Sequence, residues 1–274
     1  MSDHVSTLPV TLSACTPKLL VVGGIMRGGT SLLREVLNSH PGIALFSCEL
    51  RAMGWCGFAG GIHVAAVHHY LWRRRARIGN REFRKQAYNY MWRLLRRNGV
   101  FDPVELGTLR AVFAQCLASP STKYVGDKYP QYISHYPKCI HDEDSRCIFI
   151  IRDPRDSVSS LYERIQRGHW RQNWTKPYTS VAGAAKYWME TATAIKSVQT
   201  LGGNALVIRY EDLVLDPQRT LEMLARHLEL PVEGFDAGLP HADSIGKHKQ
   251  FLTPCQVDEV EQIAGKLMPH FSYE

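Results

Sequence analysis

Residues 19–38 read LLVVGGIMRGGTSLLREVLN, an apolar run followed by a glycine-rich turn and an amphipathic segment. The run Leu19–Gly24 predicts a buried strand, and Thr30–Asn38 predicts a helix with its leucines and valine on one side. A strand, a glycine-rich loop and a helix in this order are typical of a phosphate-binding loop, because glycines let the backbone approach the anion and the helix offers free N–H groups. This stretch therefore predicts an α/β fold of the P-loop type, with an anion site after the first strand.

The loop departs from the nucleotide-binding pattern GxxxxGK[ST] at one position. Gly24, Gly29 and Ser31 match the pattern, but Thr30 stands where the lysine is expected, and the positive charge lies at Arg27 instead. Kinases and triphosphate hydrolases use that lysine on the β- and γ-phosphates beside magnesium, and we find no acidic residue at a predicted strand end that suits magnesium. The loop therefore favours a phosphate-linked anion over metal-assisted triphosphate chemistry, with a glycine-rich turn and a surface arginine as the alternative.

The remainder of the chain repeats the alternation of strands and helices. Further strands are predicted at 123–126, 147–151 and 205–208, and further helices begin near residues 102, 153, 180, 216 and 253. Continuous apolar strands alternating with helices predict a parallel sheet flanked by helices, with ligands at the carboxyl ends of the strands. We expect one domain, 1–274: the loop and first helix at 18–50, a basic helical insertion at 51–120 that forms a lid over an acceptor, and the rest of the sheet with the C-terminal helices at 121–274.

The positive charge of the chain is concentrated in one window. The 274 residues have a formal net charge of +7, yet residues 71–100 hold ten arginines and lysines against Glu82 alone, so this window carries the whole excess. Such a patch attracts anions and fits a docking face for an acidic acceptor, an anionic membrane or nucleic acid. A solvated helix face is the equally weighted alternative. No nucleic-acid-binding motif accompanies the charge, so we expect no nucleic-acid partner.

Cysteine usage and the N-terminus bear on location. Seven cysteines without a CxxC pair predict reduced thiols in a reducing compartment. The N-terminus MSDHVSTLPV lacks the features of a secretory signal, and the apolar run up to Met26 is shorter than the ~20 residues that span a bilayer. We therefore expect a cytoplasmic protein with no transmembrane segment; a homodimer is left open.

A second anion site is predicted after the strand CIFII at 147–151. Arg152 follows this strand, and Ser160 lies about two turns into the next helix, roughly 9 Å along its axis. A guanidinium fork and a hydroxyl at this spacing can hold one phosphate group. The equally weighted alternative is a structural ion pair between Arg152 and Asp156 with a surface serine.

Together, these loops resemble those of the sulfotransferases that use 3′-phosphoadenosine 5′-phosphosulfate (PAPS). GIMRGGTSLLREVLNSHPGI is similar to their 5′-phosphosulfate loop, FIIRDPRDSVSSLY to their 3′-phosphate motif, and VGDKYP at 125–130 to the lysine-bearing strand end between the two. The segments at 208–230 and 247–268 resemble the late strand–helix unit and the C-terminal helix of the family. The resemblance extends from residue 19 to about 268 and is closer to the tyrosylprotein, bacterial and glycan-type branches than to the cytosolic small-molecule branch.

The resemblance implies which residues hold the cofactor. Arg152 and Ser160 would hold the 3′-phosphate, and Tyr210 would support the nucleotide site. Lys247 would belong to a segment, 244–247, that replaces the usual glycine–tryptophan motif. The 5′-phosphosulfate would be held by Arg27, Gly28, Gly29, Thr30 and Ser31. Gly28 departs from the family, which has a serine there, so one hydroxyl is missing.

The resemblance also implies the reaction, an in-line transfer of sulfonate from PAPS to a hydroxyl or amine, leaving 3′,5′-ADP without a metal. Glu49 would be the base, within a Glu-x-Arg stretch, and Lys128 and Arg27 would stabilise the sulfonate and the leaving phosphate. His40 and His63 are rival bases, although His40 reads as a helix cap. The alternatives are a P-loop kinase-like phosphotransferase and a non-catalytic anion-binding module. The acceptor stays open among acidic compounds, sugars, lipids, peptides and natural-product scaffolds.

Overall fold

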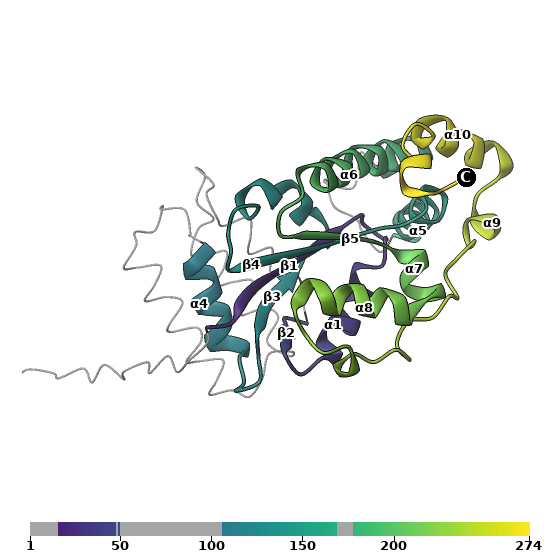
Figure 1. Ribbon diagram of the computed structural model, residues 1–274. Helices are drawn as coiled ribbons and strands as arrows, with labels where there is room; N and C mark the ends of the chain where they lie inside the picture. The colour runs from purple at the N-terminus through teal and green to yellow at the C-terminus, as the bar shows by residue number, and fades with distance from the viewer. Residues whose placement is uncertain (1–15, 48, 50–105, 169–177) are drawn as a thin grey trace, which may run out of the picture.

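A computed structural model of the chain describes residues 16–47, 49, 106–168 and 178–274. Its centre is a five-stranded, fully parallel sheet with the strand order β2-β3-β1-β4-β5. The strands are β1 (Lys18–Gly24), β2 (Ile43–Leu45), β3 (Tyr124–Lys128), β4 (Ser145–Ile151) and β5 (Ala205–Arg209). The predicted α/β fold with a parallel sheet is therefore confirmed, with β1 at its centre (Figure 1).

Helices cover both faces of this sheet. The helices are α1 (Thr30–Ser39), α4 (Leu106–Leu117), α5 (Pro154–Gln166), α6 (Val181–Leu201), α7 (Tyr210–Leu215), α8 (Pro217–Leu228), α9 (His248–Phe251) and α10 (Pro254–Ala264), with short 3₁₀ helices at Pro130–Lys138, Val232–Gly234 and Pro269–Phe271. Figure 1 shows α5, α6 and α10 on one side of the strands and α1 and α8 on the other.

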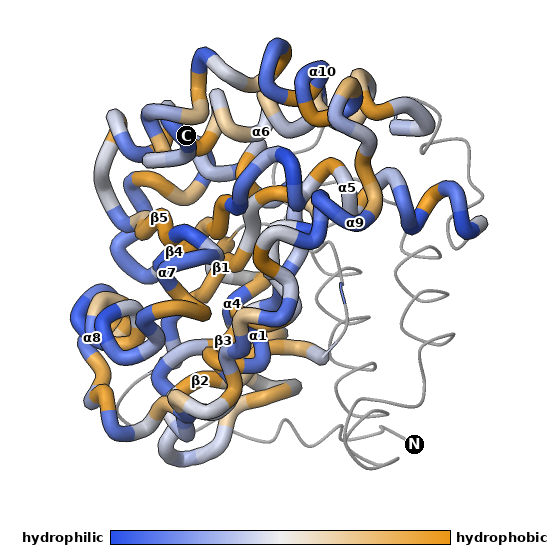
Figure 2. Tube along the Cα trace, turned by 90° about the vertical axis from the view of Figure 1, so that its right-hand side faces the viewer, coloured by the Kyte–Doolittle hydropathy of each residue, from blue (hydrophilic) through white to orange (hydrophobic). Residues whose placement is uncertain are grey.

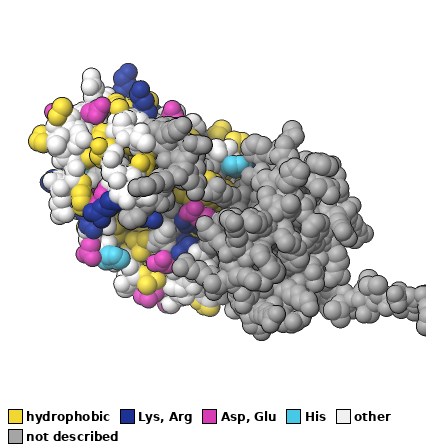
Figure 3. All heavy atoms as spheres, turned by 180° about the vertical axis from the view of Figure 1, so that it is seen from behind, with side chains coloured by type: hydrophobic (Ala, Val, Ile, Leu, Met, Phe, Trp, Pro, Cys, Tyr) yellow, Lys and Arg dark blue, Asp and Glu magenta, His cyan; other side chains and the backbone are white. Residues whose placement is uncertain are grey.

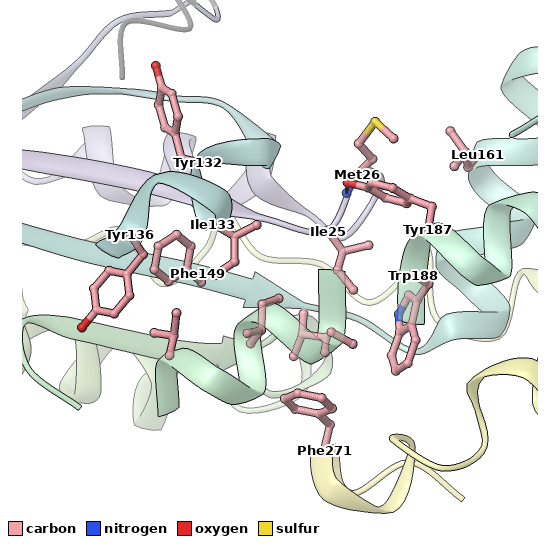
Figure 4. Packing of buried hydrophobic residues seen from close by; sticks show 14 of the residues in the cluster. Ile25, Met26, Tyr132, Ile133, Tyr136, Phe149, Leu161, Tyr187, Trp188 and Phe271 are labelled. Atoms are coloured by element: carbon pink, nitrogen blue, oxygen red, sulfur yellow. Dashed lines mark hydrogen bonds between the residues drawn. The ribbon is translucent and has the colours of Figure 1, made fainter. Parts of the chain in front are cut away.

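Two hydrophobic cores follow from the alternation of side chains along β1. Leu19 and Val21 belong to the core under α4, α5, α6 and α10, whereas Leu20 and Val22 belong to the core under α1, α7 and α8. Figure 2 shows the apolar strands at the centre with more polar segments outside. In the first core, Trp188 packs edge-on against Phe271, and Met26 lies beside Tyr187 (Figure 4).

Three helices begin where the sequence places a capping residue before a proline. Asp153 accepts a hydrogen bond from the Arg155 amide at 2.8 Å and starts α5. Asp216 caps α8 in the same way, and Thr253 forms a capping box with Gln256 at the start of α10. These starts confirm the predicted helix boundaries, because each proline suits the first helical turn and each cap satisfies an exposed N–H group.

Several boundaries differ from those predicted. The strand expected at 123–126 extends to Lys128, and the last helix ends at Ala264 rather than near 268. The three-residue strand β2 and the short helix α7 were not predicted.

Residues 51–105 of the predicted insertion lie outside the described residues. Its C-terminal part is α4, whose Leu109 and Phe113 are buried in the sheet core and pack beside Phe46. This described part therefore covers the sheet, and the lid at 51–105 stays a prediction.

The surface findings are limited to the described ranges. On the face shown in Figure 3, basic and acidic side chains lie interspersed, and the basic window 71–100 lies outside the described residues. No described helix is both long and apolar enough to cross a membrane. Cys139 and Cys147 are buried, Cys255 is exposed, and these three thiols are free.

Candidate functional site

A cleft of about 680 Å³ lies at the carboxyl ends of the strands. The chain leaving β1 turns to the α1 face, whereas the chains leaving β3 and β4 turn to the opposite face. Parallel α/β sheets bind ligands at such a switch point. The cleft is lined by Met26, Arg27, Gly29, Thr30, Ser31, Leu32, Glu49, Lys128, Tyr129, Pro130, Gln131, Arg152, Tyr178, Tyr210, His241 and Ser244.

The loop between β1 and α1 has a backbone that needs its glycines. Gly24 has φ +135°, and a Cβ atom there would lie 2.1 Å from the carbonyl oxygen of Ile150. Gly29 has φ +94°, and its Cβ would lie 2.4 Å from the ring of Tyr210. No side chain caps the N-terminus of α1, so its first amides are available to an anion. The predicted phosphate-loop geometry is present.

Arg27 gives this loop its charge. Its Nε donates a hydrogen bond to Ser160 Oγ at 3.0 Å, which ties the loop to α5. Desolvation lowers the pKa of Arg27, and the neighbouring guanidinium groups of Arg164 and Arg152 lower it further, with Glu163 opposing them. Cations that repel one another across a cleft gain when an anion enters between them. The arrangement therefore favours anionic ligands.

Arg152 is buried at the end of β4, with 6% of its surface exposed. Its guanidinium lies 4.6 Å from the centroid of the Tyr210 ring and 3.3 Å from the Asp156 carboxylate. It also donates to the carbonyl oxygens of Arg27, at 3.4 Å, and Ser244. Its Nε is buried without a hydrogen-bond partner, which is costly unless a ligand uses it. The residue thus has a donor to spare at the edge of the cleft.

The structure connects the two predicted phosphate loops through Arg27. Arg152 and Ser160 each contact Arg27, rather than contacting one another. The ion pair between Arg152 and Asp156, which the sequence offered as an alternative, is present. Arg152 therefore both forms a structural ion pair with Asp156 and lines the cleft.

A buried lysine and a carboxylate meet across the cleft. Lys128, at the end of β3, is 3% exposed, and its Nζ lies 2.5 Å from Glu49 Oε1 and 3.4 Å from Ser31 Oγ. A lysine beside a carboxylate and a phosphate loop can stabilise developing negative charge while the carboxylate accepts a proton. Arg51, the other charged residue of the predicted Glu-x-Arg stretch, lies outside the described residues.

Other predicted residues do not line the cleft. Lys247 is exposed at the start of α9, and Gly28 is buried within the loop. His40 is the C-cap of α1, as predicted, because its backbone amide donates to the Leu37 carbonyl oxygen at 3.2 Å. Its Nδ1 accepts a hydrogen bond from the Gly42 amide at 2.9 Å. His63, the other rival base, lies outside the described residues.

Several residues that line the cleft were not among the predicted site residues. Tyr129 and Gln131 directly follow Lys128, so their place after a strand end was a usable signal. Tyr178 packs edge-on against Tyr187, whose hydroxyl accepts a hydrogen bond from the Met26 amide at 3.3 Å. His241 also lines the cleft but comes from a loop without a local pattern, whereas Ser244 belongs to the segment 244–247 that the family resemblance had suggested.

Comparisons with known proteins point to one family. A model described as the sulfotransferase family matches residues 17–234. Protein-tyrosine sulfotransferase 1 of Danio rerio is 23% identical, over 91% of this chain and 66% of that protein, and protein-tyrosine sulfotransferase A of Caenorhabditis elegans is 22% identical, over 85% and 54%. This chain thus spans about two thirds and about half of the lengths of these curated relatives.

A solved structure shows the same fold. The sulfotransferase domain of the Synechococcus PCC 7002 olefin synthase has a TM-score of 0.57 and 22% identity, over 96% of this chain and 97% of that chain. Because the family model matches well over half of the residues, this chain belongs to the sulfotransferase family.

Proposed function

We propose that this protein transfers a sulfonate group from PAPS to a hydroxyl or amine acceptor. The observation that carries the proposal is the contact of Lys128 Nζ with both Glu49 and Ser31, which joins a cation–carboxylate pair to the phosphate loop. Family membership and the protein-tyrosine sulfotransferases among the relatives support the same reaction class.

The residues of the cleft suit a nucleotide with phosphate at both ends. The amides and hydroxyls of Thr30 and Ser31, together with Arg27, would hold the 5′-phosphosulfate at the N-terminus of α1. Arg152, with its unpartnered Nε, and Ser160 would hold the 3′-phosphate. The fit is supported by the mutual repulsion of the arginines, which an anion would relieve.

The bound donor supplies an activated sulfonate on a phosphate leaving group. The Glu49 carboxylate would accept the proton of the acceptor as the new S–O or S–N bond forms. Lys128 and Arg27 would stabilise negative charge on the sulfonate oxygens and on the departing phosphate. Because these side chains supply the positive charge, we expect no metal requirement.

Two measurements test this proposal. Formation of 3′,5′-ADP from PAPS should fall in Arg152→Ala through weaker nucleotide binding, and in Glu49→Ala through a slower chemical step. Undiminished activity in both variants would contradict the residue assignment. Magnesium-dependent ATP turnover would instead support the kinase-like alternative, which Thr30 at the lysine position disfavours.

The acceptor remains the open part of the proposal. Tyrosine-containing peptides belong in an acceptor panel because curated relatives are named for protein tyrosine. Acidic compounds, sugars, lipids and natural-product scaffolds complete the panel. A cytoplasmic location and a homodimer stay predictions.

A further inference from the structure

The segment that precedes α9, far along the sequence from the phosphate loops, contributes to the wall of the cleft. His241 and Ser244 line the cleft, and the Ser244 carbonyl oxygen accepts a hydrogen bond from Arg152. This loop is anchored to α5 just beyond Ser244. The anchor is Asp156, which lies in the first turn of α5, four residues after Arg152, and is 3% exposed.

The two carboxylate oxygens of Asp156 make four contacts, which are three hydrogen bonds and one ion pair. The Gly246 amide donates to Oδ2 at 2.8 Å, and the His248 amide and Nδ1 donate to Oδ1 at 3.0 and 2.8 Å. The fourth contact is Arg152, at 3.3 Å from Oδ2. Three of the four therefore come from residues 246–248, so this one side chain joins the loop to the arginine.

The carboxylate of Asp156 is charged in this setting. Burial alone would raise its pKa, but the His248 amide, the Arg152 charge and the other hydrogen bonds outweigh burial and leave the pKa below its usual value. An ionised carboxylate only accepts hydrogen bonds, so Nδ1 of His248 carries the proton and donates it. The contact is a charge-assisted hydrogen bond between buried groups.

We propose that the Asp156–His248 clasp is a positioning device that holds residues 244–248 against Arg152, and thereby sets the preference for a nucleotide with a 3′-phosphate. The inference rests on the proposed function, in which Arg152 holds that phosphate. With the clasp closed, Arg152 is held between Tyr210, Asp156 and Ser244, so little side-chain freedom is lost when a phosphate binds.

The 5′ end of the site is built from other elements, although it is joined to the 3′ end where Arg152 donates to the carbonyl oxygen of Arg27 and Arg27 donates to Ser160. Arg27–Gly29 belong to the loop between β1 and α1, Thr30 and Ser31 begin α1, and the pair of Lys128 and Glu49 lies at the end of β3. Neither group contacts His248. Opening the clasp should therefore weaken recognition of the 3′-phosphate and leave recognition of the 5′-phosphate in place.

Titration calorimetry with 3′,5′-ADP and with AMP, which lacks the 3′-phosphate, separates the two ends. His248→Ala should weaken 3′,5′-ADP binding about tenfold, as expected for a lost charge-assisted hydrogen bond, and change AMP binding less than about twofold. His248→Asn should restore most of the loss, because the asparagine Nδ2 can donate from nearly the position of the histidine Nδ1. Lys249→Ala, an exposed neighbour in α9, is the matched control and should behave as the wild type.

The possible results distinguish a failure of the proposed clasp from a failure of the proposed role of Arg152. An equal loss for both nucleotides, no loss in His248→Ala, or no rescue in His248→Asn would overturn the clasp. If His248→Ala does not fold, as judged by circular dichroism and melting, the test passes to His248→Gln against His248→Asn, of which only the asparagine variant should keep the preference for 3′,5′-ADP. A wild-type protein that binds both nucleotides equally would instead overturn the proposed role of Arg152, and the clasp with it.

Discussion

At the residue scale, the charge and the shape of Arg152 are separable by mutation, because its guanidinium makes contacts in several directions. Arg152→Lys keeps the charge, but an ammonium group cannot stack on Tyr210 and also reach Asp156 and the Ser244 carbonyl. We expect the dissociation constant for 3′,5′-ADP to rise by roughly 10- to 100-fold, measured by calorimetry. Arg219→Lys, at an exposed position of α8, should leave it unchanged. Wild-type affinity in Arg152→Lys would show that charge alone suffices.

Glu49 allows chemistry to be tested apart from binding. Glu49→Gln keeps the size of the side chain and an oxygen for Lys128, but it removes the base. We expect kcat to fall by roughly 100-fold or more, within the range for general-base catalysis, while 3′,5′-ADP binds as before. Single-turnover kinetics with saturating PAPS measure the effect, and Glu35→Gln, an exposed position in α1, is the control. An unchanged single-turnover rate would exclude Glu49 as the base.

The residues that the sequence could place follow strands directly. Thr30, Lys128 and Arg152 lie within a few residues of an apolar run, so their position at the sheet edge follows from fold class alone. His241 and Ser244 reach the cleft through a loop held by the distant Asp156, and no local pattern reports such a contact. The partner of Ser160 was unpredictable for the same reason, because it depends on how α5 lies beside the first loop.

At the element scale, the predictable elements are those with strong local signals. Helices α5, α8 and α10 begin at a cap followed by proline, and β1 and β4 are continuous apolar runs. The missed elements, β2 and α7, have three and six residues. So short a strand depends on its pairing with β3. Three residues are too few to show the alternation of apolar and polar side chains by which a strand is predicted.

The phosphate loop tolerates no side chain at Gly29. In Gly29→Ala the new Cβ would lie 2.4 Å from the ring of Tyr210 at a φ of +94°, so both the loop and the ring must move. We expect a lower melting temperature and no measurable 3′,5′-ADP binding. Gly107→Ala, in α4, is the matched control, because nothing lies within 4 Å of its Cβ, and it should be neutral or stabilise the fold by up to about 1 kcal/mol. Normal binding in Gly29→Ala would contradict the close packing of loop and ring.

The contact of α8 with the sheet should be sensitive to acid. Desolvation, and then the charge of Arg146, lower the pKa of His227 from 6.5 to about 4, and its Nε2 is buried without a partner. Between these values the unfolded chain binds more protons than the folded one, so stability falls as the pH drops from 6.5 to 4. At pH 4 the free energy of unfolding should be about 3 kcal/mol lower than at neutral pH because of this one group.

Urea unfolding across this pH range measures the effect. His227→Gln removes the titrating group, so its stability should fall less steeply than that of the wild type between pH 6.5 and 4. Parallel pH profiles for the two proteins would show that His227 does not contribute. Exposed His241→Gln is the control and should follow the wild type.

At the scale of the whole molecule, the cleft lies between segments that belong to the two hydrophobic cores. The loop after β1 leads to α1 and one core, while Lys128 and Arg152 come from strands whose chains continue into the other core. A ligand that contacts all three therefore bridges the two halves of the molecule. Binding is thus linked to global unfolding, because the unfolded chain does not bring these groups together.

Thermal unfolding with nucleotide tests this linkage. At about 100 times its dissociation constant, 3′,5′-ADP should raise the unfolding free energy by about 2.7 kcal/mol and the melting temperature by roughly 6 °C. The shift should shrink as salt rises, because salt screens the attraction between the Arg27 guanidinium and the phosphate. AMP at the same concentration should give a smaller shift, since it has no group for Arg152. A larger shift with magnesium ATP than with 3′,5′-ADP would favour the kinase-like alternative, in which a triphosphate is the ligand of the loop.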